Sequence, residues 1–359
     1  MTAQPIPQLQ PLSIGQLLDR AIRLYRRNFL TFIGIIALVQ APLSLLGFGV
    51  GLITVNNMAE VLDSGASQTD PFAIFTPGYF TGLAVSVLLA MVTLLLISGV
   101  ASAAMTRAVA DNYLGQPVSI LGSYRRIGRA WAPLVGTLLL AGVIYLGICL
   151  WWIVPCVGWL TGLGMIAFFG LVIFPLVVPI VVLEQRGSLY AIQRAWNLAR
   201  RRFWWVLGFV FILALFSQLV VAGPSAVVGF IFQSLLTDAV QSGSAGSLIV
   251  LQTVIQSLLS LVTSLLYLPL QLAGMTLLYF DLRVRTEGFD LALLAQNAGA
   301  EPMAVADVTA QVPEAERTSL VTVNELGYFA GISVAVFALY FLILAAFAAL
   351  GVVLAAAYG

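Results

Sequence analysis

Three carboxylates stand at the ends of long apolar stretches, and each has an arginine within four residues of it. The carboxylates are Asp111, Glu184 and Asp281, and the nearest arginines in the sequence are Arg107, Arg186 and Arg283. A carboxylate at the C-terminal end of a helix meets the negative end of the helix dipole, so it needs a cation close by. We therefore expect the three carboxylates to act as clamps, each paired with a nearby arginine or with one from an interfacial helix, such as Arg20, Arg126 or Arg194. The alternative is a proton or coupling-ion site.

A second group that could do chemistry is a row of polar side chains in the apolar stretch 248–280. Its members are separated by three or four residues, which places them along one side of a helix. Because such a row is costly against lipid, we expect it to face the interior of a helix bundle. One interpretation is packing by interhelical hydrogen bonds, and the other is a polar pathway. The row consists of Gln252, Gln256, Ser260, Thr263, Tyr267 and Gln271.

The composition excludes most catalytic chemistry. The chain has no histidine, and all 16 basic residues are arginine. Without histidine there can be no Ser-His-Asp triad, no Cys-His pair and none of the common zinc sites, and without lysine no Schiff base can form. We expect no enzyme activity, no catalytic residue, no cofactor and no metal ion. We expect the two cysteines, Cys149 and Cys156, to be small buried apolar side chains.

The elements that position these residues are membrane-spanning helices. Of the 359 residues, 61% are hydrophobic and only 9% are charged, with a mean hydropathy of +1.03. A helix needs about 20 apolar residues to cross a bilayer. Seven stretches qualify and predict an all-α polytopic bundle: 29–55, 79–105, 133–155, 159–183, 203–222, 248–280 and 326–357. The apolar residues 224–236, which follow Gly223 and Pro224, are either a kinked extension of the fifth span or a re-entrant piece.

The arginines are confined to alternate loops. The loops at about 56–78, 156–158 and 237–247 contain none. The positive-inside rule places the arginine-rich loops and the N-terminus in the cytoplasm and the C-terminus outside, in the plasma membrane. We expect these arginines to bind anionic lipid headgroups as well as to fix the orientation. They are Arg20, Arg23, Arg26, Arg27, Arg125, Arg126, Arg129, Arg194, Arg200, Arg201 and Arg202.

An internal repeat accompanies these arginines. Residues 19–34 and 193–208 match at Arg20 and Arg194, at Arg26 and Arg200, and at Phe29 and Phe203, and a weaker copy lies at 119–136. Each copy begins as a basic amphipathic helix that we expect to lie in the headgroup plane. Ser13, with Gln16 in a capping box, and Ser188 are the expected N-caps. The pattern predicts three units, each an interfacial helix followed by a transmembrane hairpin.

The chain divides into three parts. Residues 1–295 form the six-span membrane domain, 296–325 an acidic flexible cytoplasmic linker, and 326–359 a C-terminal transmembrane helix. Small residues in that last helix, Gly327 and Gly331 and also Ala345 and Ala349, have the spacing that permits close helix contact.

The stretches PLSIGQLLDRAIRLYRRNF, VVLEQRGSLYAIQRAWNLARRRFWWVLG and LLYFDLRVRTEGFDL resemble the glycerophosphoryl diester phosphodiesterase membrane domain family and its uncharacterised bacterial relatives. The resemblance covers about residues 11–295. It implies a six-helix membrane domain without the soluble phosphodiesterase domain that some members carry.

These observations favour a non-enzymatic scaffold or assembly factor of a bacterial inner membrane, with a basic cytoplasmic face. Its expected partners are anionic lipids and a membrane or cytoplasmic protein, and we expect no nucleic-acid partner. The alternative is a transporter or lipid-handling protein that uses the polar row at 252–271.

We predict seven spans with the N-terminus inside and the C-terminus outside. Reporter fusions at Gly115 and Gly299 should give cytoplasmic signals, and a fusion at Gly359 an external one, because the arginine-rich loops stay inside. An external signal at Gly299, or a cytoplasmic one at Gly359, would contradict the predicted number of spans.

Overall fold

The computed structural model describes residues 10–63, 72, 75–113, 118–242, 245–291 and 321–358. These residues form helices and no strands, which confirms the predicted all-α polytopic bundle. Seven helical segments of this part of the chain are long and apolar enough to cross a membrane. They are Phe29–Glu60, Pro77–Tyr113, Trp131–Trp151, Val157–Glu184, Phe203–Leu236, Gly246–Glu287 and Val323–Leu342.

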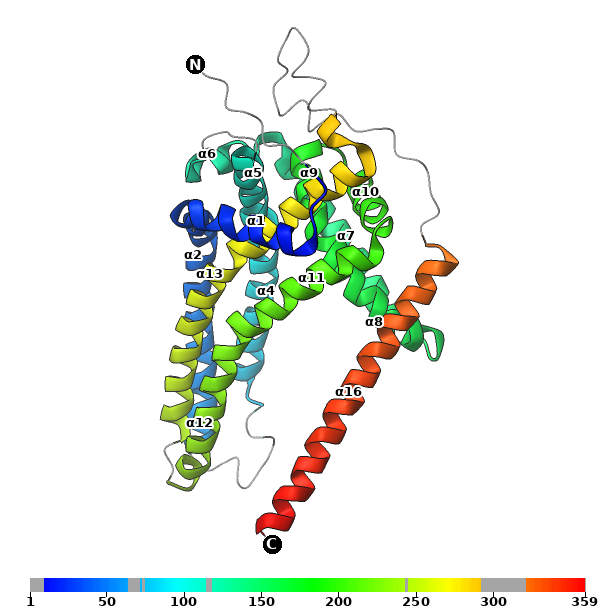
Figure 1. The fold of residues 1–359 in the computed structure, drawn as a ribbon. Coiled ribbons are helices and arrows are strands. Elements are labelled where there is room, and N and C mark those ends of the chain that lie inside the picture. The colour runs from blue at the N-terminus through cyan, green and yellow to red at the C-terminus, as the bar shows by residue number, and fades with distance from the viewer. Residues whose placement is uncertain are drawn as a thin grey trace.

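The three helices predicted to be basic and amphipathic lie at one end of the bundle, which we call the arginine-rich end (Figure 1). They are α1 (Ile14–Arg27), α6 (Ile120–Arg125) and α10 (Ser188–Arg200). The capping box of Ser13 and Gln16 is present on α1. The cap predicted for α10 is wrong: the N-cap is Gly187, and the Ser188 hydroxyl donates instead to the Pro133 carbonyl at 3.3 Å. That bond fastens α10 to the neighbouring span α7 (Trp131–Trp151).

Tyrosines fasten the other two amphipathic helices to membrane spans. The Tyr25 hydroxyl of α1 donates to the Leu266 carbonyl at 2.9 Å, and the Tyr124 hydroxyl of α6 donates to the Ile35 carbonyl at 2.6 Å. Burial raises the pKa of Tyr124 to about 12, so its hydroxyl keeps the proton that this bond needs. All three helices are therefore held to the bundle by hydrogen bonds as well as by their apolar faces.

Two long hairpins pack together along the bundle. One joins α2 (Phe29–Asp63) to α4 (Pro77–Leu95), and the other joins α12 (Gly223–Ser242) to α13 (Ala245–Glu287). The hairpin of α7 and α8 (Val157–Phe168) is shorter, and its turn lies part-way along the long ones (Figure 1). The turn is exposed at Trp152, Val154 and Val157, and Cys156 lies exposed in it with a positive φ of 63°, so the prediction that both cysteines are buried is wrong.

Three spans contain a short π-helical segment. These segments are η1 (Leu96–Ala101) between α4 and α5 (Ser102–Tyr113), η3 (Phe169–Ile173) between α8 and α9 (Phe174–Glu184), and η4 (Gln218–Ala222) between α11 (Phe203–Ser217) and α12. A π segment leaves the helix continuous but shifts the register of its faces. The fifth span therefore runs on through Pro224, and residues 224–236 are its extension rather than a re-entrant piece.

The packed core lies towards the arginine-rich end. Every residue from Leu176 to Glu184 of α9 is buried, as are most residues of α5 and the second half of α13. Small residues of α5, such as Ala103, Ala104 and Ala108, let these three helices approach one another closely. Farther along the bundle large apolar side chains are exposed on the outside, as expected where lipid is the solvent.

The last helix, α16 (Val323–Tyr358), packs on α8 through its first turns. Phe329 is fully buried, with its ring 5.8 Å from the rings of Phe168 and Phe203 and 6.1 Å from Trp196. The backbone of α16 approaches α8 at Gly164, whose amide donates to the Ser333 hydroxyl at 2.9 Å. Beyond Ser333 the described side chains are mostly exposed, and Figure 1 shows this part of α16 continuing past α8 to the level of the far ends of the long hairpins.

The small residue that permits this contact is therefore not one of those predicted. A Cβ on Gly327 or Gly331 would meet only open space, and Ala345 and Ala349 are exposed. The linker predicted at 296–325 lies outside the described residues as far as 320.

We predict that Gly164→Ala loosens the docking of α16. The new Cβ would lie 2.2 Å from the Phe329 carbonyl oxygen, so the two helices must move apart, at a cost of about 1–3 kcal/mol. Gly147→Ala is the control, because a Cβ there meets nothing. The measurement is thermal unfolding in detergent, and equal midpoints for the two variants would show that the contact is not tight.

Candidate functional site

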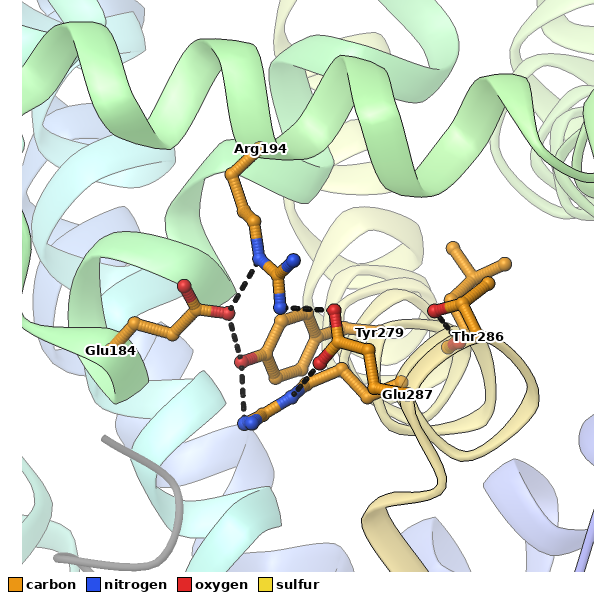
Figure 2. Close-up of polar contacts among 7 residues, drawn as sticks. Glu184, Arg194, Tyr279, Thr286 and Glu287 are labelled. Atoms are coloured by element: carbon orange, nitrogen blue, oxygen red, sulfur yellow. Dashed lines mark hydrogen bonds and ion pairs between the residues drawn. The ribbon is translucent and has the colours of Figure 1, made fainter. Parts of the chain in front are cut away.

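Four charged residues and one tyrosine form a largely buried cluster at the arginine-rich end of the bundle (Figure 2). The Arg194 Nε atom of α10 lies 3.3 Å from Glu184 Oε1 at the end of α9, and the Tyr279 hydroxyl donates to the same oxygen at 2.8 Å. Arg283 donates to the Tyr279 oxygen at 3.2 Å and to Glu287 Oε2 at 3.1 Å. Arg194 also pairs with Glu287. The two carboxylates and two guanidiniums thus form one closed network.

Charge balance explains how this network tolerates burial. Glu184 is 2% exposed, Arg194 7% and Arg283 1%, and an isolated charge in such a place would be very costly. Two negative and two positive groups cancel. Burial by itself lowers the pKa of Arg194, but the carboxylates of Glu184 and Glu287 outweigh it and raise that pKa above its ordinary value. Arg194 therefore stays charged and joins α10 to both α9 and α13.

Asp281, on α13, joins the end of the sixth span to the segment that precedes α1. Its Oδ2 accepts from Arg285 at 2.6 Å, and its Oδ1 accepts from the Leu12 amide at 2.7 Å. Arg285 also donates to the Leu12 carbonyl, and its guanidinium lies 4.8 Å from the centre of the Trp205 ring. Both polar groups of the Leu12 backbone are therefore satisfied by one ion pair of α13.

Asp111, at the end of α5, joins this helix to α6. Its Oδ2 lies 2.7 Å from Arg126 Nη1, and its Oδ1 lies 3.6 Å from Arg107 Nε. The Arg126 side chain is about half exposed, so this pair is screened by solvent and contributes less than the buried cluster.

The three carboxylates share one arrangement. Each ends an even-numbered span and contacts the amphipathic segment that begins the next unit of the predicted repeat. Asp111 contacts the end of α6 and Glu184 contacts α10, whereas Asp281 contacts the backbone in front of α1. The last contact leads back to the first unit and closes a ring. This is the order expected of three similar units, although the repeat itself stays a prediction.

Every predicted carboxylate contacts an arginine, but the arginine nearest in sequence is not always the partner. Arg283 pairs with Glu287 instead of Asp281, and Arg186 is exposed with no ion pair in the described residues. Tyr279 and Glu287 were not predicted as members of the site. Their spacing of four residues on either side of Arg283 is the signal that could have found them, because residues four apart share a helix face.

The structure divides the eleven predicted headgroup arginines. Arg194 is buried and pairs with Glu184, as the clamp prediction allows, so its prediction as a headgroup arginine is wrong. Arg20 and Arg200 are half-buried: Arg20 donates to the Tyr113 hydroxyl at 2.7 Å, and Arg200 lies 2.9 Å from Glu325 of α16. The side chain of Arg129 lies outside the described residues. Seven are exposed at the arginine-rich end: Arg23, Arg26, Arg27, Arg125, Arg126, Arg201 and Arg202.

The polar row of α13 does not face the interior as one line. Thr263 and Tyr267 are buried, Gln252, Gln256 and Gln271 are partly exposed, and Ser260 is exposed, so the prediction fails at Ser260. The Tyr267 hydroxyl donates to the Leu213 carbonyl, and Gln256 donates to the Ser225 carbonyl at 3.4 Å. These bonds join α13 to the fifth span. They support the packing interpretation without deciding against a pathway.

The fold and the ion pairs define a polytopic helical membrane protein with a neutralised polar layer at one end. Comparison of the chain with protein-family models, with curated proteins and with solved structures finds no match. Its function must therefore be argued from the geometry.

We predict that Glu184→Gln and Arg194→Gln each lower the stability of the protein by about 3–5 kcal/mol, because each leaves charges of the cluster unbalanced. The double variant should lose clearly less than the sum of the two, because it restores neutrality. Thermal unfolding in detergent measures both effects. Arg186→Gln, at an exposed position two residues away, is the control and should change little. Strictly additive losses would mean that the two side chains do not interact.

Proposed function

We propose that the protein is a non-enzymatic scaffold of a bacterial inner membrane. Its arginine-rich end lies in the cytoplasm and holds anionic lipid headgroups. The observation that carries the proposal is a pattern that occurs three times. Two consecutive exposed arginines stand at or just after the end of each amphipathic helix, before the chain enters a membrane span. The pairs are Arg26 and Arg27, Arg125 and Arg126, and Arg201 and Arg202; of these, Arg126 also pairs with Asp111.

The position of each pair suits a headgroup. The last turn of a helix carries a partial negative charge, which favours arginine there and leaves the guanidinium directed to the surroundings. An exposed aromatic side chain opens each following span: Phe29 on α2, Trp131 on α7 and Trp204 on α11. Aromatic rings prefer the boundary between headgroups and hydrocarbon. The arginines match the charged headgroup layer of a membrane, and the aromatic ring matches the boundary with the hydrocarbon.

The buried pairs make this surface rigid. The cluster of Glu184 and Arg194 fixes α10, and the bonds of Asp281 to Leu12 fix the start of α1. Arginines held on fixed helices lose little freedom when they bind a headgroup, which favours binding. A scaffold needs such a preorganised surface and needs no reacting group.

Two further expectations belong to the same proposal. A protein partner would meet the headgroup-binding surface or the exposed length of α16, and the likeness to the phosphodiesterase membrane domain family stays a prediction. The alternative function, a transporter, would depend on the polar row of α13. Two members of that row, Gln256 and Tyr267, already have hydrogen-bond partners within the protein.

We predict that replacing Arg201 and Arg202 by glutamine weakens the binding of phosphatidylglycerol to the full chain. Each exposed arginine contributes about 1 kcal/mol near an anionic surface, so the pair should account for roughly a thirtyfold change. Native mass spectrometry with added phosphatidylglycerol, at low and at high salt, measures the affinity. The difference in affinity between variant and wild type should shrink at high salt, because ions weaken the attraction between the wild-type arginines and the anionic lipid.

Arg200→Gln is the matched control. It removes the same charge from the neighbouring position, but that guanidinium faces Glu325 of α16. It should lower stability more than lipid affinity. If the double variant retains phosphatidylglycerol as well as the wild type at low salt, the exposed arginines serve orientation alone and the proposal fails.

A further inference from the structure

A groove lies between α2 and α4, where the protein meets the lipid. Its volume is about 540 Å³, and its walls include Leu43 and Gly47 of α2 and Leu89 of α4. Four hydroxyl side chains also line it, although most of the neighbouring surface is apolar. They are Ser44, Ser86, Thr93 and Ser98.

These hydroxyls have no hydrogen-bond partner within the described part of the chain. Other hydroxyls of the same span bond to its backbone: Thr81 donates to the Pro77 carbonyl at 2.8 Å, and Ser102 donates to the Gly99 carbonyl at 3.1 Å. A hydroxyl without a partner in hydrocarbon is costly. Four along one groove therefore indicate that something with hydrogen-bond acceptors occupies it.

A second and larger groove begins where the first one ends. It has a volume of about 870 Å³, lies between α4, α7 and the α8–η3 segment, and shares Leu94 and Ser98 with the first groove. Its lining is almost entirely apolar. Gly142 and Gly170 leave room in its wall, and the Tyr145 ring stacks on Phe169 with the ring centres 6.3 Å apart. The two grooves thus meet at the π segment η1.

We propose that the two grooves together bind one lipid with two acyl chains. The acceptor oxygens of its glycerol esters lie against the hydroxyls of the first groove, and one acyl chain lies in the apolar groove beside α7. Ester oxygens only accept hydrogen bonds and serine and threonine hydroxyls can donate, so the two sets are complementary. A branched ligand fits because the two grooves diverge from shared residues.

The depth of the hydroxyls selects the leaflet. Ser98 lies 15 residues before Tyr113, which ends α5, and Ser86 lies 27 residues before it. At 1.5 Å per residue these side chains lie roughly 22 and 40 Å along the helix from the arginine-rich end. The hydrocarbon core is about 30 Å thick, and the charged residues Arg107 and Asp111 near the end of α5 lie outside it. Ser86 therefore lies near the far boundary of the core, and Ser98 lies nearer its middle. The lipid belongs to the leaflet opposite the exposed arginines, and this site is independent of the headgroup surface proposed above.

The test uses the full chain in lipid nanodiscs with a diacyl phosphatidylglycerol that carries a photoreactive diazirine in one acyl chain. After illumination, adducts are mapped by mass spectrometry. Native mass spectrometry of the detergent-extracted protein then counts the lipids that stay bound. A single-chain lysophosphatidylglycerol with the same headgroup is the comparison probe.

Two pairs of variants make the test specific. Gly142→Leu fills the apolar groove, and Gly147→Leu adds the same side chain to α7 outside it; a Cβ meets open space at both positions. Thr93→Val removes a hydroxyl that lines the first groove, whereas Thr81→Val removes one already bonded to its own helix. Thermal unfolding confirms that each variant is folded.

We expect adducts on the walls of the second groove, around Leu94 and Gly142. Gly142→Leu should weaken diacyl lipid binding about tenfold relative to Gly147→Leu, and Thr93→Val should weaken it relative to Thr81→Val. The lysolipid should bind more weakly than the diacyl lipid. Equal binding by both members of each pair would overturn the proposal, as would equal binding of the two probes or a tightly held peptide in place of lipid. Loss of binding only in the Arg201 and Arg202 variant would leave the headgroup surface standing and remove this site.

Discussion

The structure depends on the neutralisation of charges that are buried at the edge of a membrane. Glu184 and Glu287 could not lie where they do without Arg194 and Arg283, and the guanidiniums could not lie there without the carboxylates. These four residues come from α9, from α10, which follows it closely in the chain, and from α13, which is distant from both in sequence. Because each charge must stay close to its opposite, the three helices can adopt few positions relative to one another. The apolar contacts around them have no comparable directionality.

A second property follows from where the carboxylates stand. Each ends a span and contacts the amphipathic segment of the following unit, and Asp281 returns to Leu12 in front of α1. The amphipathic helices are therefore part of the tertiary structure rather than appendages on a lipid surface. This explains why α10 buries Ala195, Leu198 and Ala199 together with Arg194. It also separates the arginines into two groups: those that face inwards join helices of the bundle, and those that are exposed are the ones proposed to bind headgroups.

Much of the fold could be predicted from the sequence. The spans were visible because a bilayer demands about 20 apolar residues from each helix, and the cap at Ser13 was visible because capping is local. The candidate site was less predictable. A helical projection places Arg194 on a polar face, and its pairing with a carboxylate at the end of a span was predicted, because such a carboxylate needs a cation. Its second partner, Glu287, belongs to a helix distant in sequence, and no local pattern indicates that contact. For the same reason the spacing on α16 suggested contacts at Gly327 and Gly331, whereas Gly164 of α8 makes the close approach. The two grooves beside η1 are formed by the packing of four spans. The sequence of a single span therefore contains no pattern that predicts them.

The ring that Asp281 closes has a consequence for how the chain is made. The Leu12 amide and the Asp281 carboxylate are separated by 269 positions. Ribosomes add about 5–20 residues per second, so roughly 15–50 s pass between the synthesis of the two. During that interval α1 is already outside the ribosome, and its apolar face of Leu17, Ala21 and Leu24 has no helix of the sixth span to cover it. A basic amphipathic helix can wait on the membrane surface, which shelters such a face. The predicted position of α1 at the membrane surface would shelter this face until α13 is made, after which α13 covers it.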